Sequence, residues 1–283
     1  MTGARASMAF DLAPYLALWQ LTPDGAVIET AQARLMPTRR GSQKLMLKLA
    51  LTAEELAGFD ALIWWKGNGA VQVLNRAGPA ILMPRAETLP NLAELARTGQ
   101  DDLATTILCN TAAKLHQPST RARPISAQPL SHWFRDLRPT AADHGGIFRK
   151  ALTELDRLLA ADPVSILLHG DLHHENTLFF PEGWAAIDAK GLIGPAELDY
   201  AVLFANPDLS DPSHKCARLP GVAARRLGQI SALSGHDSRM ILRWLLAWAG
   251  LSASWFLQDA PLDLPRVETV LFLAEWAAGQ LGR

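Results

Sequence analysis

Features that define several common protein classes are scarce in this sequence. Its 283 residues include only two cysteines, Cys109 and Cys216, which lie far apart and outside any C-x-x-C spacing. They indicate neither a disulfide framework nor a structural zinc site, and this fits a reducing cytoplasm. The longest apolar stretch, Trp244 to Leu257, is interrupted by glycine and serine and is shorter than the roughly 20 residues that span a bilayer. Residues 1–10 show no export signal, so we expect a cytoplasmic protein without a membrane partner.

An excess of one charge is also missing. The chain carries 27 Lys and Arg against 28 Asp and Glu, and the basic residues are scattered rather than grouped. Nucleic acid is therefore not expected as a partner. Because 49% of the residues are hydrophobic and only 19% are charged, the sequence cannot be a disordered tail or a coiled coil. Its length suits two domains or one bilobal domain.

Strand patterns come first along the chain and helical patterns later. Two strands joined by a hairpin are predicted between residues 26 and 50, and a capping box at Thr52 and Glu55 predicts a helix after them. A second strand pair is expected at residues 71–74 and 80–83. Helical periodicity then covers residues 92–115, 148–160, 222–233, 239–256 and 266–281, interrupted by brief apolar runs near 165–187. This order predicts an α+β protein in which a small antiparallel lobe packs against a helical lobe.

The most informative segment is H-G-D-L-H-H-E-N at residues 169–176, followed by Asp188. Asp171 and Asn176 share one polar loop, and Asp188 ends the next apolar run. This spacing places a carboxylate, an amide oxygen and a second carboxylate around one cleft. Phosphoryl transfer from ATP needs such a set, because one acidic group accepts the proton of the acceptor hydroxyl while the other two groups hold Mg²⁺.

Two simpler interpretations of the segment explain less of it. Three histidines could indicate zinc, but His173 and His174 are adjacent and would point to different sides of an extended chain. Asp171 beside Gly170 could also be an ordinary turn residue. Neither interpretation gives Asp171, Asn176 and Asp188 a joint role, so we favour phosphoryl transfer.

The strings H-G-D-L-H-H-E-N and I-D-A-K-G-L-I-G, at residues 169–176 and 187–194, resemble the aminoglycoside phosphotransferases. The resemblance is closest to the streptomycin 6-kinase branch, also called the aminoglycoside/hydroxyurea resistance kinases. It extends over residues 25–260 and implies a two-lobed protein-kinase-like fold. A nucleotide-binding lobe would then cover residues 1–86 and a helical lobe residues 87–283, with a hinge near residues 83–88.

This resemblance also implies roles for individual residues of the segment. Asp171 would be the catalytic base, and Asn176 and Asp188 would be the ligands of Mg²⁺. His169 and His173 would support the loop structurally. Asp199 would brace the same loop rather than touch substrate.

Upstream, the resemblance implies a nucleotide site. Lys48 would pair with the nucleotide phosphates and be held by Glu55, with Glu54 as the alternative partner. Met83, Pro84 and Ala86 would form the hinge that meets the purine of ATP, or of GTP as the alternative donor. One departure is that the turn at residues 29–34 contains no glycine, so a G-x-G-x-x-G loop is absent.

The acceptor implied by the resemblance is a cationic aminoglycoside such as streptomycin. Carboxylates and aromatic rings suit guanidinium groups, and the candidates for contact are Lys190, Glu197, Trp255 and Asp259. Lys190 could instead approach the transferred phosphoryl group or pair with a loop carboxylate.

Other nearby side chains are expected to be structural. Trp244 and Trp248 share a helical stripe with Trp255 and should lie mostly in the core. His116 should be a packed histidine, and residues 135–146 could form a lid over the acceptor.

The predicted activity is therefore ATP-dependent, Mg²⁺-dependent phosphorylation of a hydroxyl group of streptomycin or a relative, which would confer resistance. Two alternatives stay open: a small-molecule kinase acting on a sugar or an amino alcohol, and a kinase-fold protein that binds a ligand without catalysis. The second alternative is weakened because Lys48, Asp171, Asn176 and Asp188 are all present.

Overall fold

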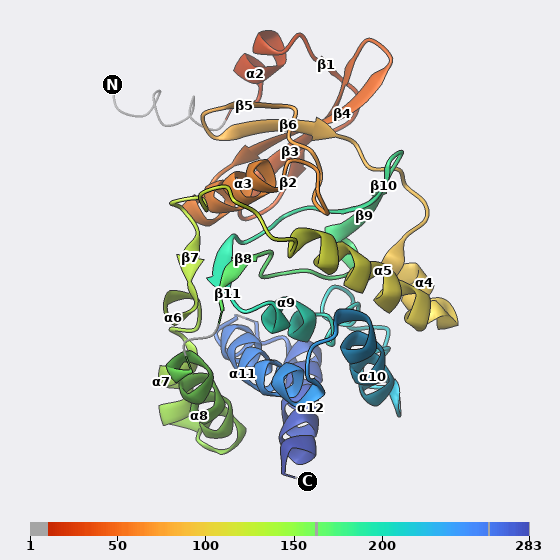
Figure 1. The fold of residues 1–283 in the computed structure, drawn as a ribbon. Coiled ribbons are helices and arrows are strands. Elements are labelled where there is room, and N and C mark those ends of the chain that lie inside the picture. The colour runs from red at the N-terminus through yellow and green to blue at the C-terminus, as the bar shows by residue number, and fades with distance from the viewer. Residues whose placement is uncertain (1–10, 162–163, 260, 283) are drawn as a thin grey trace.

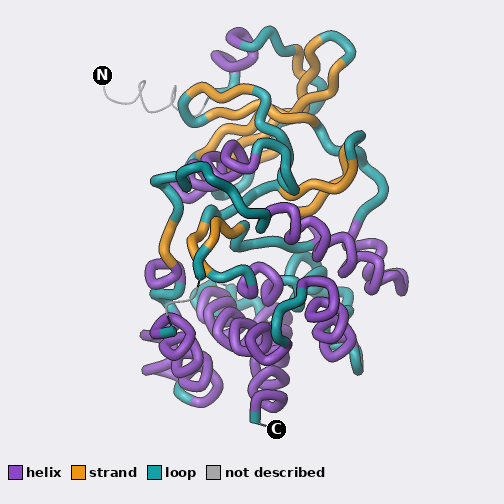
Figure 2. The backbone as a smooth tube through the Cα atoms, in the orientation of Figure 1, coloured by secondary structure: helices purple, strands orange, loops and turns teal. Residues whose placement is uncertain are grey.

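The computed structural model describes residues 11–161, 164–259 and 261–282, so the segment examined for an export signal, residues 1–10, lies outside the described residues. Strands gather at the N-terminal end of the molecule and helices at the C-terminal end (Figures 1 and 2). The predicted α+β class is confirmed. The strand-rich N-terminal lobe comes first along the chain, and the helical C-terminal lobe follows it (Figure 1).

The N-terminal lobe is built on one antiparallel sheet. Its strands lie in the order β1-β3-β4-β6-β5, and β2 pairs with β3. The strands are β1 (Thr22–Pro23), β2 (Ile28–Glu29), β3 (Ala33–Arg40), β4 (Gln43–Ala50), β5 (Asn75–Ala77) and β6 (Ala80–Pro84). The predicted hairpin between residues 26 and 50 is present as β3 and β4, which pair along their full length.

Alternation along β4 gives the two faces of this sheet different roles. Leu45, Leu47 and Leu49 are fully buried in a small hydrophobic cluster beside α2 (Ala13–Leu18). Lys48 therefore points to the opposite face, because successive strand residues alternate. On that face lies α3 (Ala53–Trp65), which begins at the predicted capping box: Thr52 Oγ1 accepts a hydrogen bond from the backbone N–H of Glu55.

The expectation of a strand at residues 71–74 is wrong. Ala70 forms a bridge with Ala186, and Val71 N donates to Ala186 O, so the start of this apolar run crosses to the C-terminal lobe; its end returns to β6, where Leu74 N donates to Leu82 O at 2.8 Å. The strand that pairs with β6 begins only at Asn75. The predicted end of β6 at Pro84 is confirmed, as expected for a residue without a backbone N–H.

The C-terminal lobe is mainly helical. Its α-helices are α4 (Leu92–Leu95), α5 (Asp101–Leu115), α6 (Leu130–Trp133), α7 (Leu137–His144), α8 (Gly146–Ala160), α9 (Glu197–Val202), α10 (Val222–Ser234), α11 (Ser238–Phe256) and α12 (Leu264–Leu281). The single helix predicted over residues 92–115 is interrupted at η1 (Ala96–Gln100), because Thr98 and Gly99 leave helical geometry and Gly99 has φ 91°.

Short strands lie between the lobes, as the apolar runs near residues 165–187 predicted. They form a hairpin of β9 (Thr177–Phe180) and β10 (Gly183–Ala186) and a sheet in the order β7-β11-β8. The members of that sheet are β7 (Gln128–Pro129), β8 (Ile166–Leu168) and β11 (Leu192–Gly194). The short helix η2 (His174–Asn176) precedes β9. Consequently β8, η2 and the β10–β11 connection bring the segments around residues 170 and 188 together.

The larger hydrophobic cluster joins the lobes. It includes Phe59 and Ile81 from the N-terminal lobe and Leu168, Leu172 and Leu245 from the C-terminal lobe. The boundary at residues 86 and 87 stays a prediction; β6 ends at Pro84 and α4 begins at Leu92.

Candidate active site

Lys48 occupies a buried position on β4, with only 3% of its side chain exposed. It forms an ion pair with Glu55 from the first turn of α3, and its Nζ lies 2.6 Å from Asp188 Oδ1. Burial raises the pKa of Glu55 although Lys48 opposes the shift. Glu54, the alternative partner, instead contacts Lys190 at 2.8 Å. Two carboxylates therefore hold the Lys48 ammonium in one place.

The loop that precedes Asp171 is held by a buried carboxylate. Asp199, from α9, is fully buried and accepts hydrogen bonds from the backbone N–H groups of His169 (3.0 Å) and Gly170 (2.7 Å). His116 Nε2 lies 2.9 Å from the same carboxylate. Burial would raise the pKa of Asp199, but the contacts with His116 and the backbone outweigh it and lower the pKa. Asp199 lies where a bracing residue was expected, and His116 is packed as expected.

His169 fixes the same loop from inside. Its Nε2 lies 2.7 Å from Ile187 O, and its Nδ1 accepts a hydrogen bond from Asp171 N at 3.2 Å. Burial lowers the pKa of His169 against the opposing pull of Asp199 and Asp171. A neutral ring that donates through Nε2 satisfies both contacts, so His169 ties the backbone of Asp171 to the residue before Asp188.

Asp171 and Asn176 face each other across the loop. Asn176 Nδ2 donates to Asp171 O at 2.9 Å and to Asp171 Oδ2 at 3.3 Å. His173 Nε2 lies 3.7 Å from Asp171 Oδ1, and its ring contacts Glu175 at 3.2 Å. Burial disfavours the imidazolium of His173, but the two carboxylates outweigh burial and raise the pKa. Asp171 keeps 36% of its side chain exposed, which leaves it open to a substrate.

Asp188 has an unusual backbone conformation, with φ 58°. Asp tolerates this left-handed region better than most residues, and two backbone bonds hold it there: Ile187 N to Asn176 O and Lys190 N to His169 O. The neighbouring loop also presses on α3. A Cβ added to Gly58 would lie 2.0 Å from Ala189 O, so only glycine lets α3 approach this closely.

A cavity of about 340 Å³ opens between these elements. Lys48, Glu55, Asp171, Asn176 and Asp188 all line it, together with the turn at residues 30–33. Asn176 uses its Nδ2 on Asp171, which leaves its amide oxygen to act as a ligand. This oxygen and the Asp188 carboxylate are the hard donors that Mg²⁺ prefers, so the residues present fit a magnesium–nucleotide complex. We name this space the phosphate cavity.

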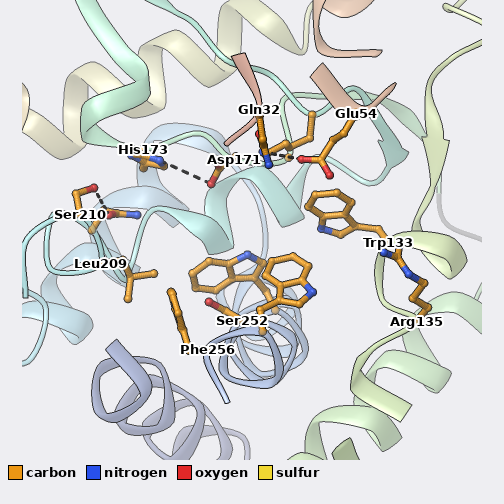
Figure 3. Close-up of a pocket in the computed structure, with 15 residues that line it drawn as sticks. Gln32, Glu54, Trp133, Arg135, Asp171, His173, Leu209, Ser210, Ser252 and Phe256 are labelled. Atoms are coloured by element: carbon orange, nitrogen blue, oxygen red, sulfur yellow. Dashed lines mark hydrogen bonds and ion pairs between the residues drawn. The ribbon is translucent and has the colours of Figure 1, made fainter. Parts of the chain in front are cut away.

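A second cavity, of about 380 Å³, adjoins the first and is named here the acceptor cavity. In Figure 3, Gln32 and Glu54 reach toward Asp171 on one side, and Ser252 and Phe256 of α11 lie on the other. Its wall is aromatic: Trp133, Trp248, Trp255 and Phe256 line it. The rings of Trp133 and Trp255 meet edge to face at 5.3 Å. This wall is suited to a cationic, partly planar ligand.

The structure distributes the predicted acceptor residues unevenly. Trp255 and Lys190 line the acceptor cavity. Glu197, the first residue of α9, does not; its Oε1 lies 3.1 Å from His236 Nδ1. Asp259 is an exposed residue beyond the end of α11 and lines neither cavity. Of the predicted lid at residues 135–146, only Arg135 reaches the acceptor cavity.

One wall of the acceptor cavity is a loop held by arginines. Asn206, Leu209 and Ser210 line the cavity. Arg226, which is buried and paired with Asp101, donates to Asn206 O at 2.8 Å. Two further arginines on η1 and α12 donate to the carbonyls of residues 207 and 209, at 3.2 Å and 2.5 Å. The backbone of this wall is therefore fixed before any ligand binds.

The predicted hinge residues lie where β6 leaves the N-terminal lobe. Pro84 pairs with Leu45 at the end of β6. The hydrogen bonds Arg85 N to Lys44 O (3.3 Å) and Glu87 N to Phe179 O (2.8 Å) bracket Ala86. Met83, the residue of β6 before Pro84, is buried. Contact of Met83, Pro84 and Ala86 with a purine stays a prediction.

Several cavity residues were missed by the sequence analysis. Trp133 lies in the short helix α6, and Trp248 was assigned to the core; it is buried, but it also lines the acceptor cavity. Gln32 and Glu54 reach this cavity from the N-terminal lobe. Only the i, i+7 spacing of Trp248 and Trp255 on one helix face could have suggested a shared wall.

Comparison with known proteins decides the family. The model of the family described as aminoglycoside/hydroxyurea antibiotic resistance kinase matches residues 18–260. This chain belongs to that family. The kinase is 45% identical to the streptomycin 3''-kinase of Klebsiella pneumoniae, over 85% of this chain and 90% of that protein. It is 29% identical to the streptomycin 6-kinase of Streptomyces griseus, over 85% and 80% of the two chains. The resemblance identified from the motifs is confirmed.

Solved structures agree on the fold of this kinase. The amicoumacin kinase hAmiN, solved with AMP-PNP and Ca²⁺, is 12% identical with a TM-score of 0.64 and covers 99% of this chain and 96% of that chain. A thermostable mutant of the aminoglycoside phosphotransferase APH(4)-Ia was solved in a ternary complex with ADP and hygromycin B. It is 16% identical with a TM-score of 0.59, and the match covers 95% of this chain and 96% of that chain. The predicted protein-kinase-like fold is confirmed.

Among the described residues, no helix is both long enough and apolar enough to span a membrane. The cytoplasmic location stays a prediction.

Proposed function

We propose that this kinase transfers the terminal phosphoryl group of ATP, as its Mg²⁺ complex, to the 3''-hydroxyl of streptomycin. The observation that carries the proposal is a phosphate cavity and an acceptor cavity that meet at Asp171 in a chain 45% identical to a streptomycin 3''-kinase. The lower identity to the streptomycin 6-kinase, 29%, favours the 3''-position over the 6-position.

The residues of the phosphate cavity have distinct tasks in this reaction. Lys48, held by Glu55, pairs with phosphate oxygens of the nucleotide. Asn176 and Asp188 hold Mg²⁺, which offsets phosphate charge when it is bound. A hydroxyl of the acceptor lies against Asp171 and gives its proton to that carboxylate. The new bond joins the acceptor oxygen to the terminal phosphorus as the bond to the bridging oxygen of ADP breaks.

The acceptor cavity supports streptomycin through its chemistry. Streptomycin carries guanidinium groups, which are planar cations that stack on aromatic rings. The ring of Trp255 is held in place, because its Nε1 donates to Asp136 at 3.0 Å and the ring packs at a steep angle against Trp133. Hydroxyurea, the substrate in the name of a relative from Kitasatospora aureofaciens that is 27% identical over 96% of this chain, would fill little of the cavity.

The test is ATP-dependent phosphorylation of streptomycin by the purified enzyme, with the modified position assigned by NMR. We expect the 3''-phosphate as product. Asp171→Asn should lower kcat by about 10²–10⁴-fold, which is the usual contribution of a positioned base. Asp156→Asn is the matched control, because Asp156 is an exposed carboxylate on α8 that pairs with Arg138 and lines neither cavity. A 6-phosphate would contradict the assigned position, and full activity of Asp171→Asn would contradict the assigned base.

A further inference from the structure

The phosphate cavity and the acceptor cavity share four side chains. Gln32, Asp171, His173 and Lys190 line both. Group transfer has to cross this shared wall, because a nucleotide on one side must meet an acceptor on the other. Lys190 carries the ammonium group of the wall, and the side chain is only 18% exposed.

Lys190 is held at the wall by Glu54. Its Nζ lies 2.8 Å from Glu54 Oε1 and 3.5 Å from Gln32 Oε1. Glu54 lines the acceptor cavity but not the phosphate cavity, whereas Lys190 lines both. The ion pair therefore consists of a carboxylate that faces the acceptor and a cation that can face either ligand.

The charges around the acceptor cavity are balanced while this ion pair is formed. Glu54 and Asp171 supply two carboxylates, and Lys190 and the exposed Arg135 supply two permanent cations; His173 is the remaining titratable group of the lining. A cationic ligand gains little from a balanced wall. Withdrawing Lys190 toward the phosphate cavity would leave the carboxylates in excess.

We propose that Lys190 exchanges Glu54 for the terminal phosphate of the bound nucleotide, and that the released Glu54 then binds a guanidinium group of the acceptor. The proposal rests on the proposed function, since it concerns a cationic acceptor in the same site. Phosphate carries more negative charge than the Glu54 carboxylate and lies on the side that Lys190 already lines, so the exchange needs only a side-chain movement. The released Glu54 carboxylate can then pair with a planar guanidinium group, as carboxylates do with arginine side chains.

This exchange makes the two ligands promote each other's binding. A nucleotide that attracts Lys190 creates the anionic acceptor site, and by linkage a cationic acceptor that occupies Glu54 favours nucleotide binding by the same factor. ADP lacks the terminal phosphate, so it should promote acceptor binding less than AMP-PNP. The arrangement also delays acceptor binding until a phosphoryl donor is present.

The test is isothermal titration of streptomycin into the enzyme, alone and with saturating AMP-PNP and Mg²⁺. For the wild type we expect AMP-PNP to tighten streptomycin binding by about 5- to 150-fold, the usual range of coupling between sites. In Lys190→Met, Glu54 has lost its pairing with Lys190 even when no nucleotide is bound. Streptomycin should then bind more tightly than to wild type without nucleotide, and AMP-PNP should add little. In Glu54→Gln, streptomycin should bind weakly with or without AMP-PNP.

Two controls separate this exchange from general effects of charge or stability. Lys150→Met removes an exposed lysine from α8, and Glu268→Gln removes a carboxylate that pairs with Arg218 on the surface; both should retain the wild-type coupling. Melting temperatures of all variants show that they are folded. The proposal is overturned if Lys190→Met binds streptomycin no more tightly than wild type in the absence of nucleotide, or if it keeps the full coupling. A wild-type enzyme that neither binds nor phosphorylates streptomycin would instead overturn the proposed function.

Discussion

Gly58 provides a sharp test of how α3 positions the loop that carries Asp188. An ideal Cβ at this residue would lie 2.0 Å from Ala189 O, and Ala189 stands between Asp188 and Lys190. A carbon and a carbonyl oxygen rarely approach within 3.0 Å, so Gly58→Ala must separate α3 from this loop by about 1 Å or more. The opposing atom is backbone, and no side-chain rotation can relieve the contact.

The expected change in the stability of Gly58→Ala follows from two opposing effects. Alanine stabilises a helix interior by about 1 kcal/mol relative to glycine, while forced overpacking costs about 1–3 kcal/mol. Gly228→Ala isolates the first effect, because Gly228 lies in α10 and its added Cβ would meet nothing within 4 Å. Gly58→Ala should therefore be about 1–3 kcal/mol less stable than Gly228→Ala. A displacement of about 1 Å at Asp188 should also lower kcat by roughly 10²-fold.

Urea unfolding measures the change in stability, and steady-state phosphorylation of streptomycin measures the change in kcat. We expect Gly228→Ala to keep wild-type kcat with equal or higher stability. Gly58→Ala should lose activity under conditions where it is still folded. If Gly58→Ala matches Gly228→Ala in both stability and kcat, the contact between α3 and Ala189 does not position Asp188.

Two further predictions follow from buried groups. Burial raises the pKa of the Cys109 thiol to about 12 and also raises the pKa of the Cys216 thiol. At pH 8 the thiolate fraction of Cys109 is then about 10⁻⁴. Ellman's reagent should therefore label neither thiol until urea unfolds the protein. The pKa of Asp199 is lowered in the folded state, so its contribution to stability is complete above the unfolded pKa of about 3.9 and is lost as the pH falls through the folded pKa. Asp199→Asn should destabilise the enzyme at pH 7, and the difference from wild type in urea unfolding should shrink below about pH 4; a difference independent of pH would contradict this.

The centre of the site could be predicted because short-range spacing determines it. Asp171 and Asn176 lie in one loop, and Asp188 follows across the β9–β10 hairpin. Chain connectivity alone brings these residues together. Lys48 was predicted from the family resemblance, and the structure gives the physical reason for its position: alternation along β4 turns the leucines to one face and the lysine to the other.

The acceptor cavity could not be predicted in the same way. Its wall combines α6, α11, the 206–210 loop and the first turn of α3, and no local periodicity relates these segments. Glu197 and Asp259 were chosen for their charge and their place in the sequence. The structure instead pairs Glu197 with His236 and leaves Asp259 exposed. Charge alone does not indicate whether a carboxylate faces a cavity.

The first turn of α3 shows why adjacent residues of like charge can serve different ligands. Consecutive helix residues point about 100° apart, so Glu55 reaches Lys48 in its own lobe while Glu54 reaches Lys190 in the other lobe. Among the described ion pairs, Lys48 contacts Glu55 and Asp188 but not Glu54. The Glu54–Lys190 pair can therefore open while Lys48 stays fixed by Glu55 and Asp188. In the proposed exchange, a nucleotide would therefore draw Lys190 away from Glu54 while Glu55 and Asp188 keep Lys48 in place.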